Sequence, residues 1–362
     1  MLLRRPLRAL QVEPTTRCTR SCAVCPRTVF ADRWRSEDLD PVAWGRLRTD
    51  LRLAQHLHLQ GWGEPLLHPR LRDMVRDATE ARCRVGLTTN GDLLEENASW
   101  IIEDKVDLVT VSVAGAASNH ARLRDGSNLK TVYRSLSALA RRRGRRRPKL
   151  QVSYLLTADN AEDLADAVQG AAEAGADEVF VIHLDVTLTA ELAGKTAFSG
   201  AGLREGVDSA LDRAADRARR VGIRFREPAR RAEELLSCAL DPTRFAFVSC
   251  AGVVTPCVNL GLPIDGRIVR FSEQGEQETT SVEWGDLHTQ SLQEILAGDR
   301  AEHFRAPFYA RKAAERRFLL AQRGWGVAAL QRLERAARQR DLELARSPFP
   351  SECEGCPKAA GW

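Results

Sequence analysis

Short apolar segments alternate with longer amphipathic segments through the first half of this chain, and this alternation restricts the possible folds more than any other feature. Strands are predicted at Leu10–Glu13, His56–Gln60, Arg84–Thr88, Leu108–Val113, Leu150–Leu156 and Glu178–His183. Helices are predicted at Pro41–Leu53, Pro69–Ala81, Glu95–Asp104, Leu129–Arg143 and Ala161–Ala174. Such a pattern is typical of parallel strands joined by crossover helices. Because six units are fewer than the eight of a closed barrel, we predict the α/β class and a partial (β/α)6 TIM-like barrel.

Three cysteines follow the first predicted strand, in the run Cys18-Thr-Arg-Ser-Cys22-Ala-Val-Cys25-Pro26. Three thiolates do not fill the four-coordinate shell of a zinc ion, and they leave one iron of a 4Fe–4S cluster without a protein ligand. A zinc site or a redox-active Cys-x2-Cys pair is the alternative. Zinc sites usually supply four ligands and this loop contains no histidine, so the spacing favours an iron–sulfur cluster with one open coordination position.

Cysteine content and the lack of targeting signals indicate the compartment. The 362 residues include nine cysteines, an odd number that argues against a disulfide framework. The N-terminus lacks the apolar core of a signal peptide, and the sequence has no apolar run of about 18 residues. We therefore expect a cytoplasmic protein with reduced cysteines and no membrane contact. The net charge of +5, from 54 basic and 49 acidic residues, argues only weakly for a nucleic-acid partner.

Further motifs lie at the ends of the next predicted strands. Gly61-Trp62-Gly63-Glu64-Pro65 ends the second strand, Thr88-Thr89-Asn90-Gly91 ends the third, and Ser112 ends the fourth. Arg124 follows, before a glycine-containing turn and the next helix. In this order, and after a Cys-x3-Cys-x2-Cys loop, these motifs resemble the radical S-adenosylmethionine (SAM) enzymes.

This resemblance implies a cofactor set and a site. Cys18, Cys22 and Cys25 would bind a 4Fe–4S cluster whose open iron chelates SAM, and one electron would cleave SAM to a 5′-deoxyadenosyl radical. The implied SAM contacts are Gly61, Gly63 and Glu64 near the amino group, Ser112 and Arg124 near the ribose and carboxylate, Asn90 in the third-strand turn, and Val24 beside the adenine. Many relatives read Ser-x-Asp where this chain has Ala114, so the hydrogen bonds there must differ.

Four cysteines in the C-terminal third resemble a second motif. Thirteen residues separate Cys238 from Gly252, four more precede Cys257, and the chain ends with Cys353-Glu-Gly-Cys356 and six further residues. The pattern resembles the SPASM or twitch extension of radical SAM enzymes, and the short end favours the twitch form. The resemblance implies that Cys238, Cys257, Cys353 and Cys356 close one auxiliary 4Fe–4S cluster. A structural zinc site is the alternative, and we expect Cys250 to be a small buried residue.

Three regions are predicted along the chain: a core barrel over 8–200, a helical linker over 201–235 and an auxiliary cluster domain over 236–362. The last region contains an Arg-rich helical insert at 305–346, with 11 basic and 4 acidic residues. Three roles remain as alternatives for this insert: a lid, a docking surface or a plain amphipathic helical pair. We favour the last. A second basic run, 141–149, is expected to be a solvated helix end.

These features predict an anaerobic radical SAM oxidase or maturase. His183 and Asp185 would shape the substrate pocket, and the auxiliary cluster would accept an electron or hold the substrate. We expect a small molecule or cofactor as substrate, since no leader-binding segment precedes the barrel, with a peptide as the alternative. A reductase, flavodoxin or ferredoxin would donate electrons. The rival hypotheses are a zinc-bound nucleic-acid-binding module and an electron carrier that never cleaves SAM.

Overall fold

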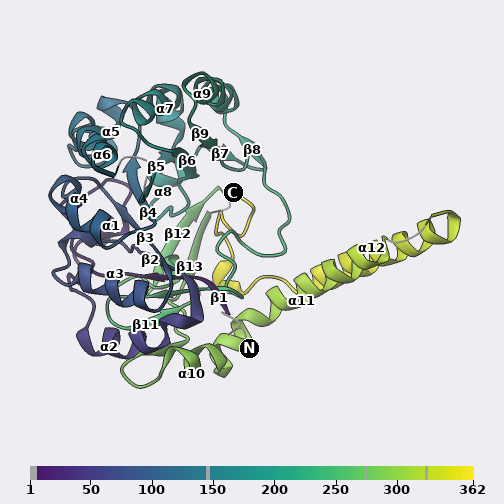
Figure 1. The fold of residues 1–362 in the computed structure, drawn as a ribbon. Helices are drawn as coiled ribbons and strands as arrows, with labels where there is room; N and C mark the ends of the chain where they lie inside the picture. The colour runs from purple at the N-terminus through teal and green to yellow at the C-terminus, as the bar shows by residue number, and fades with distance from the viewer. Residues whose placement is uncertain (1–5, 144–146, 274, 323–324) are drawn as a thin grey trace.

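The structure, a computed structural model that describes residues 6–143, 147–273, 275–322 and 325–362, contains a ten-stranded sheet (Figure 1). Strands β1 to β6, followed by β9, each run parallel to their neighbour. These strands are β1 (Leu7–Val12), β2 (Ala54–Leu59), β3 (Arg84–Thr89), β4 (Leu108–Val113), β5 (Lys149–Leu156), β6 (Glu178–His183) and β9 (Arg224–Arg226). The predicted α/β class and the six predicted strands are therefore confirmed.

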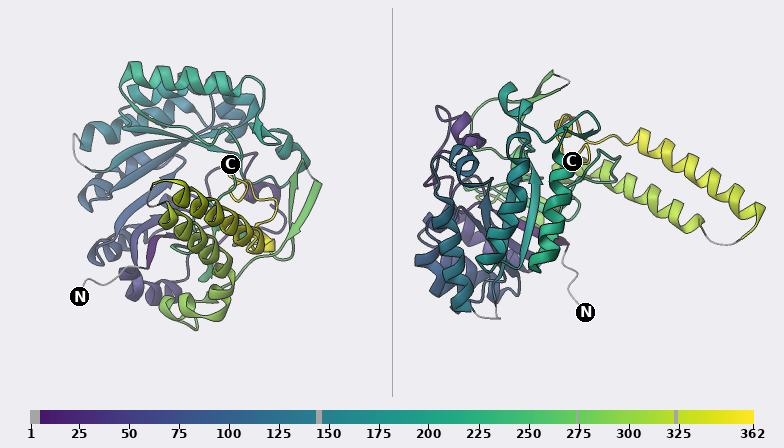
Figure 2. Two further views of the ribbon diagram at one scale, coloured as in Figure 1. Left: turned by 90° about the vertical axis from the view of Figure 1, so that its right-hand side faces the viewer. Right: turned by 90° about the horizontal axis from the view of Figure 1, so that it is seen from above.

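Helices between the strands cover the outer face of this sheet (Figures 1 and 2). They are α2 (Pro41–Asp50), α3 (Leu71–Glu80), α4 (Leu94–Glu103), α5 (Ala117–Leu123), α6 (Leu129–Arg143), α7 (Leu164–Glu173) and α9 (Val207–Val221). In α3 the buried residues Leu71, Met74, Val75 and Ala78 recur at helical spacing, which is why this segment packs one face on the strands. Asp40 begins α2 by accepting hydrogen bonds from two backbone amides of its first turn.

The inner face of the sheet is polar. Val109, Val111 and Val113 of β4 lie in the hydrophobic core. The alternate residue Thr110 donates to Oε1 of Gln151 on β5, at 3.0 Å. Because strand side chains alternate between faces, this pairing places polar groups inside the partial barrel and apolar groups against the helices.

The C-terminal third of the chain extends the same sheet. Strand β10 (Phe245–Val248) pairs in parallel with β1, and β11 (Val253–Thr255) and β14 (Gly285–Asp286) continue from it in antiparallel pairs. Strands β12 (Ile268–Ser272) and β13 (Gly275–Thr279) form a separate hairpin. The remaining short elements are α8 (Ala190–Gly194), β7 (Phe198–Ser199) and β8 (Gly202–Leu203). The three domain boundaries stay predictions, and the sheet is continuous across them.

A helical hairpin projects away from the sheet (Figures 1 and 2). After α10 (Leu292–Ala297), it consists of α11 (Asp299–Ala321) and α12 (Val327–Arg346), which pack against each other. These helices include the predicted insert 305–346. The sequence predicts an interruption near Gly324 and Gly326; Gly326 directly precedes α12, whereas Gly324, like residues 144–146 of the basic run, lies outside the described residues. No helix in the described ranges is long and apolar enough to cross a membrane.

Candidate functional site

The three N-terminal cysteines lie together in the loop between β1 and α1 (Pro26–Val29). The backbone amide of Cys25 donates to the carbonyl of Cys22 at 3.0 Å, which turns the loop back toward α1. Burial, with a smaller contribution from neighbouring thiols of the loop, raises the pKa of Cys18 and raises that of Cys25 to about 12. The loop therefore gathers three thiols whose deprotonation a metal centre would favour.

The loop after β2 packs directly against this segment. A Cβ atom on Gly63 would lie 2.2 Å from the carbonyl oxygen of Thr15, so only glycine fits there. The buried carboxylate of Glu64 accepts hydrogen bonds from the amides of Leu66, at 3.1 Å, and Asn90, at 2.7 Å. Burial raises the pKa of Glu64 to about 7 despite these bonds. Oε2 of Glu64 thus joins the loop after β2 to the turn after β3, and Oε1 binds within its own loop.

Asn90 connects the end of β3 to the cysteine loop. Its side-chain nitrogen Nδ2 lies 3.8 Å from Sγ of Cys18 and donates to Oγ1 of Thr19 at 2.9 Å. Next to it, Arg20 binds both carboxylate oxygens of Asp92, at 2.8 and 2.6 Å. The turn predicted at Asn90 therefore also holds the cysteine loop in place, and Arg20 with Asp92 is a brace that the sequence motifs did not reveal.

Two buried nitrogen donors lie at the end of α5. Nε of Arg124 and Nε2 of His120 are buried and have no hydrogen-bond partner among the residues that the structure describes. Nδ1 of His120 lies 3.2 Å from the amide of Ala114 and accepts its proton, so the ring proton belongs on Nε2. Burial, with help from the charges of Arg124 and Arg20, lowers the pKa of His120 to about 4. A neutral histidine and a charged arginine thus both offer unused donors.

Two other predicted contacts are placed without a defined partner. Ser112 is partly buried and shares the inner face of β4 with Thr110, while Val24 is half-buried between Cys22 and Cys25. Their predicted roles beside SAM stay predictions. His120 was missed at the sequence level. The available signal was a histidine one helical turn before Arg124.

The four C-terminal cysteines also converge. Burial, together with the neighbouring thiols of Cys356 and Cys238, raises the pKa of Cys257 to about 12. The pKa of Cys353 is raised by burial and then by the other three thiols. The structure therefore brings together residues that lie far apart in the sequence. In the described ranges no three His, Cys, Asp or Glu side chains are spaced to hold a single metal ion.

Cys250 is separate from this set, as expected. It is buried at 1% exposure, and its thiol donates to the carboxylate of Glu37 at 3.5 Å. The buried carboxylate of Glu13 accepts hydrogen bonds from the amides of Trp62, at 2.7 Å, and Cys250, at 3.4 Å. Burial raises the pKa of Glu13 to about 7. Glu13, which no motif indicated, therefore ties the loop after β2 to the turn before β11.

His183 and Asp185, the candidate pocket residues, lie at and beyond the end of β6. Nε2 of His183 donates to the carbonyl of Ala229 at 2.8 Å, and its buried Nδ1 has no partner among the described residues. The imidazole ring meets the edges of Phe198 and Trp362, which stack on each other with 4.5 Å between ring centroids. Asp185 forms an ion pair with Lys358, so the C-terminal segment reaches the barrel mouth.

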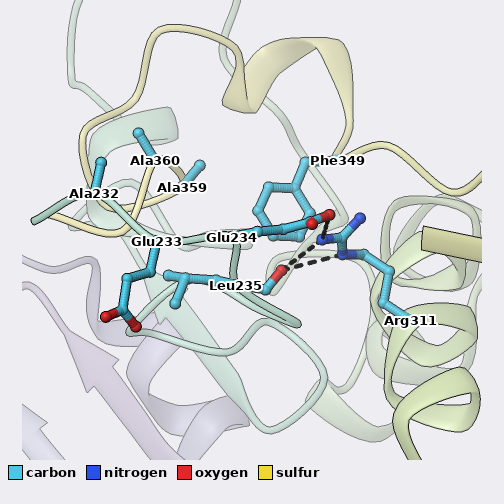
Figure 3. A pocket seen from close by; sticks show the side chains of 8 residues that line it. All are labelled: Ala232, Glu233, Glu234, Leu235, Arg311, Phe349, Ala359 and Ala360. Atoms are coloured by element: carbon cyan, nitrogen blue, oxygen red, sulfur yellow. Dashed lines mark hydrogen bonds and ion pairs between the residues drawn. The ribbon is translucent and has the colours of Figure 1, made fainter. Parts of the chain in front are cut away.

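A pocket of about 410 Å³ lies where the hairpin joins the body (Figure 3). It is lined by the linker at Ala232–Leu235, by Arg311 and Phe349, and by Ala359 and Ala360. The guanidinium of Arg311 fills one wall and binds the carbonyl of Leu235 and the carboxylate of Glu234. This guanidinium is already saturated with protein partners, and its hydrogen bonds anchor the hairpin to the linker.

Comparison with known proteins now identifies the family. The profile of the Radical SAM superfamily matches residues 12–171, and that of an iron–sulfur cluster-binding domain, SPASM, matches residues 238–317. The chain belongs to the radical SAM superfamily. Together the two matched ranges contain both motif regions, although the second ends before Cys353. The chain is accordingly a radical SAM enzyme with a C-terminal SPASM or twitch-type region, and its cofactors are SAM, a 4Fe–4S cluster and an auxiliary iron–sulfur cluster.

Several individual proteins are similar. A tungsten-containing aldehyde ferredoxin oxidoreductase cofactor-modifying protein from Pyrococcus furiosus is 26% identical over 83% of each chain. A GTP 3′,8-cyclase from Acidothermus cellulolyticus is 36% identical over 31% of this chain and 33% of its own. Among solved structures, SuiB from Streptococcus suis has a TM-score of 0.59 at 13% identity, covering 83% of this chain and 68% of its own. The anSMEcpe structure with bound AdoMet has a TM-score of 0.58 at 16% identity, covering 84% and 81%.

The residues present fit the SAM cofactor of this superfamily. SAM carries a carboxylate, and the unpartnered donors of Arg124 and His120 are groups that a carboxylate satisfies. The close approach of Gly63 to Thr15 leaves a loop of bare backbone beside the cysteines, which suits hydrogen bonds to an amino group. The structure thus offers donors and backbone for both polar ends of the methionine moiety.

Proposed function

We propose that this radical SAM enzyme is an oxidase or maturase that modifies a small molecule or cofactor, with one cluster on each cysteine set. Cys18, Cys22 and Cys25 would hold the SAM-binding 4Fe–4S cluster. The auxiliary 4Fe–4S cluster would be held by Cys238, Cys257, Cys353 and Cys356. The observation that carries the proposal is the convergence of these four thiols beside the barrel mouth, where Lys358 of the same segment reaches Asp185.

The geometry supports separate roles for these residues, each toward a different group of SAM. Arg124 and His120 would donate to its carboxylate, with Ser112 alongside at the ribose, and the backbone of Gly61–Gly63 would accept from its amino group. Glu64 and Asn90 would act mainly by fixing the loops, since their polar atoms already bind protein. Val24 would contact the adenine. With SAM bound to the open iron of the cluster, these residues would hold the source of a 5′-deoxyadenosyl radical for removal of a hydrogen atom from substrate.

His183 is the better candidate for a base at the mouth. Its pKa is lowered by burial, so the ring is neutral at pH 7, and Nδ1 is free to accept a proton because Nε2 carries the other. The carboxylate of Asp185 is already paired with the ammonium of Lys358. The substrate radical would give one electron to the auxiliary cluster and one proton to Nδ1 of His183, which leaves an oxidised product.

A cofactor or small-molecule substrate is the first choice, because the Pyrococcus furiosus protein, named as cofactor-modifying, matches across most of both chains. Peptide modification is the second candidate. SuiB, whose structure was also determined with its precursor peptide, shares the fold with a TM-score of 0.55 in that complex. The electron donor would be a reductase, flavodoxin or ferredoxin.

The test is iron counting and SAM cleavage on anaerobically reconstituted protein. The parent should hold about eight irons and release 5′-deoxyadenosine with dithionite. Cys22→Ala should abolish cleavage and keep the auxiliary cluster, whereas Cys356→Ala should keep cleavage and lose that cluster. Zinc in place of iron, or full iron in both variants, would refute the assignment.

Substrate class and the proposed base need their own measurement. Stimulation of 5′-deoxyadenosine release by the peptide-free small-molecule fraction of a cell extract would support the first candidate, and stimulation only by the peptide fraction would support the second. With the active fraction, His183→Gln should still cleave SAM but form little product. Full product formation by this variant would remove His183 from the mechanism.

A further inference from the structure

Lys358 is a cation enclosed between the barrel mouth and the auxiliary cysteines. Its ammonium pairs with Asp185, and the exposed fractions of the two side chains are 24% and 20%. Electrostatic interaction also connects it to the thiols of Cys356 and Cys238. A lysine paired with a carboxylate is protonated at neutral pH, so this side chain carries a positive charge beside Asp185.

The backbone that carries Lys358 is fixed on both sides. Gly361 has a φ of 92°, and a Cβ atom there would lie 2.6 Å from the backbone nitrogen and oxygen of Glu233. Trp362 stacks on Phe198. Figure 3 shows Ala359 and Ala360 beside the linker residue Ala232. These contacts hold the segment in place, so the ammonium keeps a defined position between carboxylate and thiols.

From this placement we propose that Lys358 raises the reduction potential of the auxiliary cluster and that Asp185 limits the increase. The inference rests on the proposed assignment of the auxiliary cluster. A cluster held by thiolates gains negative charge on reduction, and net charge is one of the factors that set its potential. A nearby cation stabilises the reduced form more than the oxidised form, and a carboxylate paired with that cation offsets part of the effect.

The chain provides a second cation on another side of the same cysteines. Arg270 lies near Cys257 and Cys353, where its charge lowers their pKa values against the larger effect of burial. Its guanidinium binds the carbonyls of Glu352 and Asn259. Lys358, unlike Arg270, pairs with Asp185 at the barrel mouth, so its charge is the one that a substrate near Asp185 would sense. A raised potential would make the cluster a better acceptor for the substrate electron.

The experiment is a redox titration of both clusters, followed by electron paramagnetic resonance. Lys358→Gln should lower the midpoint potential of the auxiliary cluster, and Asp185→Asn should raise it. Lys358→Arg should stay near the parent value. Lys195→Gln removes a lysine that is paired with Glu191 on α8, and it serves as the matched control with no expected shift. The potential of the SAM-binding cluster should stay constant in all variants.

Opposite shifts for Lys358→Gln and Asp185→Asn would support the proposal, and unchanged or same-direction potentials would overturn it. If Lys358→Gln fails to retain the auxiliary cluster, Asp185→Asn decides alone, since it keeps the ammonium and removes only the carboxylate charge. A parent protein without a second cluster signal would instead refute the proposed function, so the two failures are distinguishable.

Discussion

Replacing Arg311 tests most directly whether the auxiliary cysteines depend on the hairpin. Its guanidinium is 5% exposed and donates to the carbonyls of Leu235, Leu344 and Ser347, with a further bond to Glu234. It also lies 4.8 Å from the ring centroid of Phe349. Replacing it by methionine keeps an apolar stem and leaves these buried carbonyls without their donor.

The magnitude follows from these partners. Each carbonyl that loses a buried charged donor costs about 1 to 1.5 kcal/mol, so the three together predict a loss of about 3 to 4.5 kcal/mol in the free energy of unfolding. The Glu234 side chain is 67% exposed and stays solvated, so it adds little. Arg317→Met is the matched control. Arg317 is on the same hairpin and pairs with Glu343, but it is 59% exposed, and its loss should cost under about 1 kcal/mol.

Urea unfolding of the apoprotein, followed by circular dichroism, measures this difference. Because Ser347 lies just before the segment with Cys353, loosening it should also lower iron content from about eight toward about four per chain, with SAM cleavage retained. Equal unfolding free energies for the two variants would refute the reasoning, and so would an Arg311→Met protein with unchanged iron.

Two further predictions concern the SAM-facing loops. Gly63→Ala places a methyl group 2.2 Å from the carbonyl of Thr15, so it should cost about 1 to 3 kcal/mol and weaken SAM binding in equilibrium dialysis, whereas Gly45→Ala, with nothing within 4 Å, should do neither. Glu13 has a pKa of about 7 when folded, above the ordinary 4.5. Protonated Glu13 therefore favours the folded state, and this contribution to stability is lost as pH rises through 7. As pH rises from 5 to 8, the free energy of unfolding of the parent should therefore fall by about 3 kcal/mol relative to that of Glu13→Gln. A difference between the two proteins in urea unfolding that stays the same at every pH would contradict this.

The sequence predicted the barrel well because its signals are local. Leu108–Val113 and Glu178–His183 were predicted to the residue, since apolar runs bounded by turns specify buried parallel strands without reference to the rest of the chain. Strand β10 was not predicted as part of this sheet. Its pairing with β1 joins segments that are far apart in sequence, and periodicity contains no information on such partners.

The site shows the same limit. Spacing grouped the cysteines and position suggested Arg124 and His183, whose roles stay predictions. Sequence could not show that Asp185 would pair with Lys358, because the ion pair depends on how the C-terminal segment folds back to the barrel. Nor could it show that both oxygens of Glu64 bind backbone amides, which gives this side chain a part in supporting the loops, while its contact with SAM stays a prediction.

Trp62 explains how the two cysteine regions keep a fixed separation. Its backbone amide is held by Glu13 at the end of β1, and its indole nitrogen donates to the carbonyl of Val258 at 3.4 Å, next to Cys257. Glu13 also binds the amide of Cys250, so two independent bonds join the loop after β2 to the turns around β11. In the proposed function, electron transfer from a substrate radical to the auxiliary cluster would depend on a constant distance, and these partly buried contacts would help to keep it within the continuous sheet.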